Sequence, residues 1–152
     1  KIKQFLYEPY HYFYHLNKKE VMTAIKKILE QVGMDEACLG KYPHELSGGQ
    51  LQRISIARAL IIQPQLLICD EITSSLDQVI QRDIIELLKQ CVYKYNMAIL
   101  FVSHDLSLVH EFCHQVLVLN DGKIIEKGTI QQLYKSENEV VQNLLKAAYL
   151  NG

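Results

Sequence analysis

The chain has 152 residues, enough for one domain with its own core, and its proportions of 49% hydrophobic and 22% charged residues are those of a globular protein. The formal net charge of −1 provides no basic surplus for phosphate binding, so we expect no nucleic-acid partner. The longest apolar run with strand character, Met97 to Val102, is far shorter than the roughly 20 residues that span a bilayer, so we expect no membrane crossing.

Helical spacing dominates the first part of the chain. Apolar residues recur at helical intervals from Glu20 to Val32, and Gly33 supplies a stop. Leu51 to Ile62 is predicted as a second helix, which ends before Pro64. We therefore predict a helical subdomain over residues 1–62.

Strands and helices alternate over residues 63–152. The predicted strands are Leu66 to Cys69, Met97 to Val102 and Gln115 to Leu119, and the predicted helices are Val79 to Tyr95, Leu106 to Cys113 and Ile130 to Tyr149. Asn120 to Lys123 reads as a hairpin turn into a further strand, Lys123 to Glu126. The first two strands are wholly apolar, which is typical of buried parallel strands. The alternation predicts an α/β fold with a largely parallel sheet.

The four cysteines are Cys38, Cys69, Cys91 and Cys113. Because they form no C-x-x-C pair, neither a zinc site nor a disulfide framework is indicated. Cys69 and Cys91 lie within apolar patterns, so we expect buried thiols and a reducing, cytosolic setting.

Two acids, Asp70 and Glu71, directly follow the apolar run Leu66 to Cys69. In an open α/β sheet, ligands bind beyond the carboxyl ends of the strands. Alternation along a strand points neighbouring side chains to opposite sides, so one carboxylate could hold Mg²⁺ while the other polarises a water. Strands often end in acids, so this pair alone would not indicate a site.

A glycine pair lies upstream, in Leu46-Ser47-Gly48-Gly49-Gln50, immediately before the helix predicted from Leu51. Glycines let a backbone approach an anion closely, and a helix N-terminus presents free N–H groups with partial positive charge. Ser47 adds a hydroxyl donor. The same residues would also serve as a plain helix N-cap.

Four segments resemble the motifs of ABC ATPases. Leu46 to Leu60 resembles the signature motif with its helix, and Leu66 to Glu71 resembles the Walker B strand. Ser74 to Asp77 is similar to the D-loop, and Ser103 to Asp105 is similar to the switch-histidine loop. Because all four occur in the family's order and spacing, the resemblance is far more specific than a single motif. It implies a P-loop-type ATPase core with a helical subdomain that carries the signature.

The resemblance implies a sandwich of two ATPase domains around two ATP molecules. The residues expected to contact the γ-phosphate of ATP held by a partner subunit are Ser47, Gly48, Gly49 and Gln50. Asp70 is expected to hold Mg²⁺ through water, and Glu71 to act as the general base. His104 is expected to meet the γ-phosphate and Glu71. Asp77 is expected to cross the dimer interface.

Within the family, the chain looks most like the ATP-binding subunits of peptide and nickel importers. Tyr42 to Glu45, His104 to Val109 and Glu126 to Thr129 carry that finer match. The implied partners are a second ATPase subunit, identical or related, transmembrane permease subunits and, indirectly, a solute-binding protein. The implied location is the cytoplasmic face of the cell membrane, as a peripheral subunit. DNA-repair and translation ATPases share the signature, but no coiled-coil insert or second ATPase domain occurs here.

Three features depart from the family pattern. No G-x-x-x-x-G-K-[ST] occurs in the 152 residues, and Gly122-Lys123 lies in the hairpin instead. No Q-loop is identified, and Ile72 stands where the family usually has proline. We therefore expect the chain to be the C-terminal part of a longer subunit and to be inactive alone. The alternative is a non-catalytic subunit that donates its signature to a partner's ATP.

Two further features stay open. His110 to His114 fits the zinc-protease pattern H-E-x-x-H, although no third ligand is evident. An aromatic cluster near the start either docks onto a membrane-embedded partner or packs under the helix Glu20 to Val32. Its members are Phe5, Tyr7, Tyr10, Tyr12, Phe13 and Tyr14.

Overall fold

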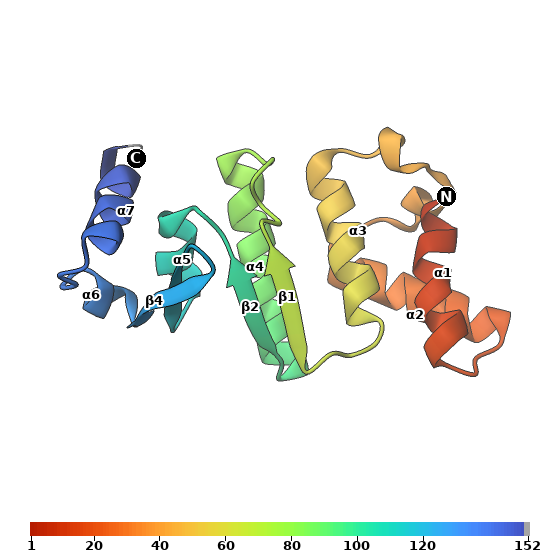
Figure 1. Cartoon of the computed structure of the whole chain (residues 1–152). Helices are drawn as coiled ribbons and strands as arrows, with labels where there is room; N and C mark the ends of the chain where they lie inside the picture. The colour runs from red at the N-terminus through yellow and green to blue at the C-terminus, as the bar shows by residue number, and fades with distance from the viewer. Residues whose placement is uncertain (151–152) are drawn as a thin grey trace. The chain divides into compact units, whose positions relative to one another are not determined.

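The computed structural model describes residues 1–150, which fall into two compact units, Lys1–Leu100 and the residues from Phe101 onward. Helices and strands are mixed along the chain (Figure 1), so the predicted α/β class is confirmed. The predicted boundary between a helical subdomain of residues 1–62 and an ATPase core stays a prediction. The helices before residue 62 share their compact unit with the first strand and the helix that follows it.

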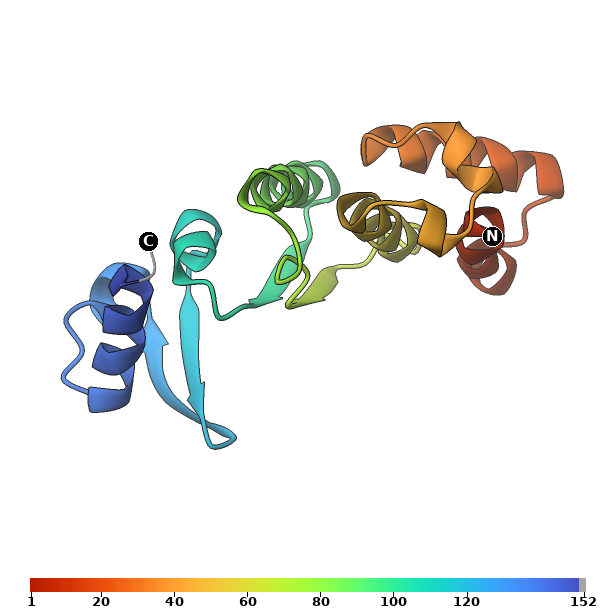
Figure 2. The same cartoon turned by 90° about the horizontal axis from the view of Figure 1, so that it is seen from above.

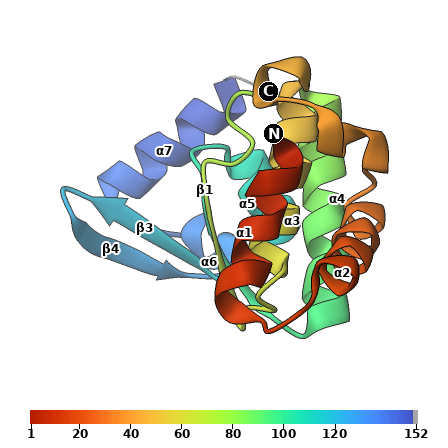
Figure 3. The ribbon, with the colours of Figure 1, turned by 90° about the vertical axis from the view of Figure 1, so that its right-hand side faces the viewer.

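Three helices pack together at the start of the first unit, with α1 beside both α2 and α3 (Figure 3). They are α1 (Ile2–Phe13), α2 (Lys18–Gln31) and α3 (Gly48–Leu60), with short 3₁₀ turns at Glu36–Gly40 and Pro43–Glu45 between the last two. Leu6, Ile25 and Ile54 are fully buried. Helix α2 begins two residues before the predicted Glu20, because the side chain of Asn17 accepts hydrogen bonds from Lys19 N–H and Glu20 N–H.

The start predicted for α3 was wrong by three residues. The helix begins at Gly48 rather than Leu51, because Ser47 and Gln50 form a capping box in which each side chain accepts a hydrogen bond from the other's backbone N–H. The prediction relied on apolar periodicity, which begins only after the glycine pair. The capping box therefore places the glycine pair inside the first helical turn.

Strands β1 (Leu66–Asp70) and β2 (Ala98–Val102) lie side by side and run in the same direction (Figure 1), joined by α4 (Gln78–Tyr95). Helix α4 covers one face of the β1–β2 pair (Figure 2). Leu67 and Cys69 are buried, whereas Leu66 is 53% exposed and Ile68 is 62% exposed. The expectation that β1 is buried on both faces is wrong, because α4 packs against only one of its faces.

Up to residue 150, the second unit contains an antiparallel hairpin and three helices. Asp121 and Gly122 have positive φ values of 47° and 73°, as a tight two-residue hairpin turn requires, so the predicted hairpin is confirmed. The predicted tail helix is divided in two, because Asn138 accepts a hydrogen bond from Val140 N–H and starts a new helix. The elements are α5 (Leu106–Phe112), β3 (Val116–Asn120), β4 (Lys123–Gly128), α6 (Ile130–Leu133) and α7 (Glu139–Leu150). Their shared core is Val118, Ile130, Leu133, Val141 and Leu145.

The cysteine predictions are confirmed as far as burial is concerned. Cys69 and Cys91 are both buried with free thiols. Burial raises the pKa of the Cys69 thiol to about 11, so it stays protonated and unreactive at neutral pH. No helix within residues 1–150 is both long enough and apolar enough to cross a membrane.

Candidate functional site

The signature segment forms an exposed helix N-terminus. Ser47, Gly48 and Gln50 are exposed and Gly49 is half-buried. The N–H of Gln50 donates to Ser47 Oγ at 3.3 Å, and Leu51 N–H donates to the Ser47 carbonyl at 2.9 Å. The N–H groups of Gly48 and Gly49 belong to the first turn, which has no preceding carbonyls to accept from it. This end of α3 can therefore donate backbone hydrogen bonds to an anion.

The capping box confirms the plainer interpretation of Ser47 and Gln50 without excluding the other one. Ser47 Oγ acts as an acceptor in the cap, and its hydroxyl hydrogen is a separate donor. Gln50 uses Oε1 to accept from Ser47 N–H at 3.1 Å, which leaves its amide nitrogen directed away from that bond. Each side chain can cap the helix and donate to a ligand at the same time.

Asp70 and Glu71 have different backbone conformations. Asp70 is the last residue of β1 and is exposed, on the same face of the strand as Ile68. Glu71 lies beyond the strand with φ at +46°, a left-handed conformation that is uncommon for a residue with a side chain. Its carbonyl accepts from Ser74 N–H at 3.1 Å and from Ser74 Oγ at 3.0 Å. The turn, rather than strand alternation, therefore sets the direction of the Glu71 side chain.

Asp77 begins α4 as its N-cap. Its carboxylate accepts a hydrogen bond from Ile80 N–H at 3.0 Å, and its carbonyl accepts from Gln81 N–H at 2.9 Å. Asp77 is exposed, so one carboxylate oxygen can cap the helix while the other faces solvent. Asp77 therefore has a local structural role in addition to any role at an interface.

Two residues that support the acidic turn were missed from the sequence. Thr73 is 2% exposed and is the buried polar side chain of this turn. Its carbonyl accepts from Gln81 Nε2 at 3.0 Å and from Leu76 N–H at 3.1 Å, which ties the turn to α4. No signal in the sequence identifies this tie, because it depends on how the turn folds back on the helix.

His104 lies in the second unit, in the turn between β2 and α5, and is exposed. The turn is held by Ser103 Oγ, which accepts from Asp105 N–H at 3.0 Å. Asp105 in turn caps α5 by accepting from Ser107 N–H at 2.9 Å and from Leu108 N–H at 3.3 Å. These bonds hold the backbone on both sides of His104.

The competing zinc pattern His110 to His114 is interrupted by the end of a helix. Helix α5 ends at Phe112, and Cys113 is extended, with φ −94° and ψ 137°. His110 and His114 therefore do not share a helix face, as H-E-x-x-H zinc binding requires. His110 instead packs edge-on against the ring of Tyr134. Among the residues the structure describes, no three His, Cys, Asp or Glu side chains gather as a metal site.

The aromatic cluster contains both buried and exposed side chains. Tyr10 is buried, and Tyr14 is half-buried and donates a hydrogen bond to the Ile61 carbonyl at 2.9 Å. Tyr12 is 73% exposed, and Phe5 lies under the Arg58 guanidinium at 4.2 Å from its ring centroid. Core packing and surface display therefore both occur along α1.

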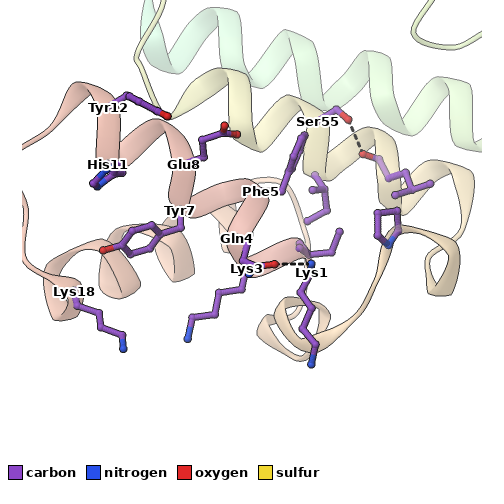
Figure 4. Close-up of a pocket in the computed structure, with 14 residues that line it drawn as sticks. Lys1, Lys3, Gln4, Phe5, Tyr7, Glu8, His11, Tyr12, Lys18 and Ser55 are labelled. Atoms are coloured by element: carbon purple, nitrogen blue, oxygen red, sulfur yellow. Dashed lines mark hydrogen bonds between the residues drawn. The ribbon is translucent and has the colours of Figure 1, made fainter.

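A groove of about 1160 Å³ runs between α1 and α3 (Figure 4). Phe5, Leu51 and Ile54 supply apolar lining, and Lys1, Lys3 and Lys18 extend their amines to the same side. Ser47 to Gln50, Asp70 and Glu71 do not line it. The groove is thus a separate feature, with an apolar floor and a basic edge.

Residues 3–74 match the family model for ABC transporters. The nickel import ATP-binding protein NikE of Escherichia coli K12 is 38% identical over 151 residues, which are 97% of this chain and 56% of that protein. The oligopeptide transport ATP-binding protein OppF of Mycoplasma genitalium is 39% identical over 137 residues, which are 90% of this chain and 16% of that protein. The chain thus spans about half the length of NikE and a smaller part of OppF.

Solved structures share the fold. The structure of cbiO1 from Clostridium perfringens, part of the ABC transporter complex cbiONQ, has a TM-score of 0.76 and 27% identity, over 99% of this chain and 60% of that one. The ATP-binding cassette MJ0796, a dimer in a post-hydrolysis state bound to ADP and Pi, has a TM-score of 0.68 and 28% identity, over 78% of this chain and 51% of that one.

Proposed function

Since the chain is homologous to the ATP-binding subunits of ABC transporters, we propose that it supplies the signature helix, the catalytic acids and the D-loop of an importer ATPase. One observation carries the proposal. The capped start of α3 presents Gly48 and Gly49 N–H groups at an exposed surface, where they can receive a phosphate.

Under this proposal, the start of α3 binds the γ-phosphate of ATP held by a second ATPase subunit. Gly48 and Gly49 donate through the backbone, and Ser47 and Gln50 donate through the hydroxyl hydrogen and the side-chain amide. Phosphoryl transfer depends mainly on positioning and on charge stabilisation at the equatorial oxygens. Donors that the capping box already holds in place need no reorganisation as that charge develops.

The acids of the same chain serve the other composite site of the two-ATPase sandwich. Asp70, an exposed carboxylate at a strand end, fits Mg²⁺, which binds proteins through one or two carboxylates and keeps several waters and phosphate oxygens. An ion held by Asp70 would neutralise charge on the phosphates. Glu71 accepts the proton of the attacking water, and His104 donates a hydrogen bond to the γ-phosphate. Asp77 faces the partner subunit with the carboxylate oxygen that does not cap α4.

The transported substrate is a peptide or a nickel or metal chelate. This proposal rests on the functions of the relatives, because one is named for nickel import and the other for oligopeptide transport. The 152 residues alone are expected to lack ATPase activity, because they contain no lysine-bearing P-loop to hold the β- and γ-phosphates.

The groove between α1 and α3 is proposed to receive a cytoplasmic segment of the permease, which would place the subunit on the cytoplasmic face of the membrane. Its apolar floor suits the apolar face of a helix, and exposed Tyr12 suits an interface anchor. The match to subunits of transport complexes supports a membrane-bound partner of this kind.

The test is ATP hydrolysis by the full-length subunit together with its permease. Tyr12→Glu is expected to abolish co-purification with the permease while ATP binding persists. Tyr93→Glu is the matched control, because Tyr93 is 92% exposed on α4, outside the groove. Absence of ATP hydrolysis by the wild-type complex would contradict the proposal that the chain is part of an importer ATPase. Normal permease binding by the Tyr12→Glu variant would contradict only the proposal that the groove binds the permease.

A further inference from the structure

Helix α3 lies close to the D-loop and the start of α4 at the glycine pair. A Cβ atom built on Gly49 would lie 2.6 Å from Ile80 Cγ2, a distance that real side chains essentially never adopt. A Cβ on Gly48 would lie 3.2 Å from Leu76 Cδ2. The glycines therefore serve a packing purpose inside the subunit, independent of any contact with a phosphate.

Ile80 connects this contact to the D-loop. Its side chain fills the space that a Cβ at Gly49 would need, and its backbone N–H donates to the Asp77 carboxylate at 3.0 Å. One residue thus contacts the signature turn through its side chain and the D-loop through its backbone. Because Ile80 contacts both, a shift of Ile80 would change the position of the signature turn relative to the D-loop.

The contact between α3 and α4 continues one turn farther along both helices. Arg53 lies four residues after Gly49, and its Nη2 is 3.6 Å from a carboxylate oxygen of Asp83, which lies three residues after Ile80. Arg53 Nη1 also donates to the Val32 carbonyl at the end of α2, at 2.9 Å. The signature helix is therefore held on the side of α4 and on the side of α2.

We propose that Ile80 is a positioning residue, which sets the distance between the signature turn and Asp77. It does so by filling the space beside Gly49 that a Cβ atom would otherwise occupy, here called the notch. This inference rests on the function proposed above, in which the signature turn meets the nucleotide of the partner subunit and Asp77 faces that subunit. Misplacement of a reacting group by about 1 Å can lower a rate about a hundredfold. A correctly filled notch is consequently a requirement for turnover.

Two substitutions of Ile80, in the full-length subunit with its permease, test whether its side chain must fill the space at Gly49. Ile80→Leu keeps the side-chain composition but moves the branch away from Cβ, so it removes the methyl group that lies at Gly49. Ile80→Val keeps that methyl group. We expect Ile80→Leu to lower kcat about tenfold or more while nucleotide affinity is unchanged, and Ile80→Val to stay close to wild type. Val79→Leu, at a neighbouring exposed position, is the control.

A second measurement reports the distance between α3 and α4 and does not depend on ATP hydrolysis. Spin labels at Ser55 and Val79, both exposed, report the separation of α3 and α4. The distance distribution is expected to shift or broaden in Ile80→Leu and to stay narrow in Ile80→Val. An unchanged distribution in Ile80→Leu would overturn the inference, as would equal losses of kcat in the two variants. A wild-type complex without ATPase activity would overturn the proposed function, and the distance measurement would still decide whether Ile80 positions the two elements.

Discussion

The signature segment and the acidic turn are both exposed, but their backbone conformations are held in different ways. Ser47 to Gln50 forms the relaxed start of a helix, with a reciprocal cap that satisfies two backbone donors. Glu71 lies in a left-handed conformation, held by Ser74 and by the turn around the buried Thr73. Strain of this kind costs about 1–3 kcal/mol and is concentrated at functional sites. The comparison indicates that the phosphate donors are set by local sequence, whereas the proposed base is set by its surroundings.

The largest expected effect tests the strained side of this comparison. Glu71→Gln keeps the shape and the backbone of the residue but cannot accept the proton of water. We expect kcat of the full-length subunit in its complex to fall about a hundredfold or more, with nucleotide binding retained. Glu86→Gln is the matched control, since Glu86 lies exposed on α4 in a surface ion pair with Lys89. An ATPase rate close to wild type would remove Glu71 from the role of base.

The next effect separates the two roles of Ser47. Ser47→Ala removes the cap and is expected to cost about 1 kcal/mol of stability, whereas Ser47→Asp keeps a capping oxygen and most of that stability but has no hydrogen-bond donor. If the hydroxyl also donates to a phosphate, both variants will have a reduced kcat although only Ser47→Ala melts earlier. Thermal unfolding and ATPase assays on the same preparations give the two readings. Full activity in Ser47→Asp, whose ionised carboxylate can only accept hydrogen bonds, would mean that Ser47 acts only as a cap.

The smallest expected effect concerns the backbone strain at Glu71. Glycine adopts positive φ without steric cost, so Glu71→Gly is expected to unfold at a higher temperature than Glu71→Gln. The greater freedom of glycine in the unfolded chain opposes this, so the net difference should be below about 1 kcal/mol. Thermal unfolding of the two full-length variants measures it. A lower midpoint for Glu71→Gly would show that side-chain contacts of residue 71, rather than its backbone, decide the stability of the turn.

Much of the fold was predictable from local patterns. Apolar periodicity located α2 and α4 to within two residues at each end, and the Asp121-Gly122 turn located the hairpin. The start of α3 was misplaced, because the capping box precedes the first apolar residue of the pattern. The tail was predicted as one helix, because the cap formed by Asn138 carries no periodic signal.

The sequence by itself determined the motifs, their order, the α/β class and the resemblance to ABC ATPases, because each of these depends on residue types at short spacings. Only the tertiary structure decided which face of β1 is covered, where α5 ends within the H-E-x-x-H pattern, and that Gly49 meets Ile80. These features depend on contacts between segments distant in the chain or on how a turn folds back against its neighbours. Periodicity and spacing report the conformation of a segment and do not report which other segment packs against it.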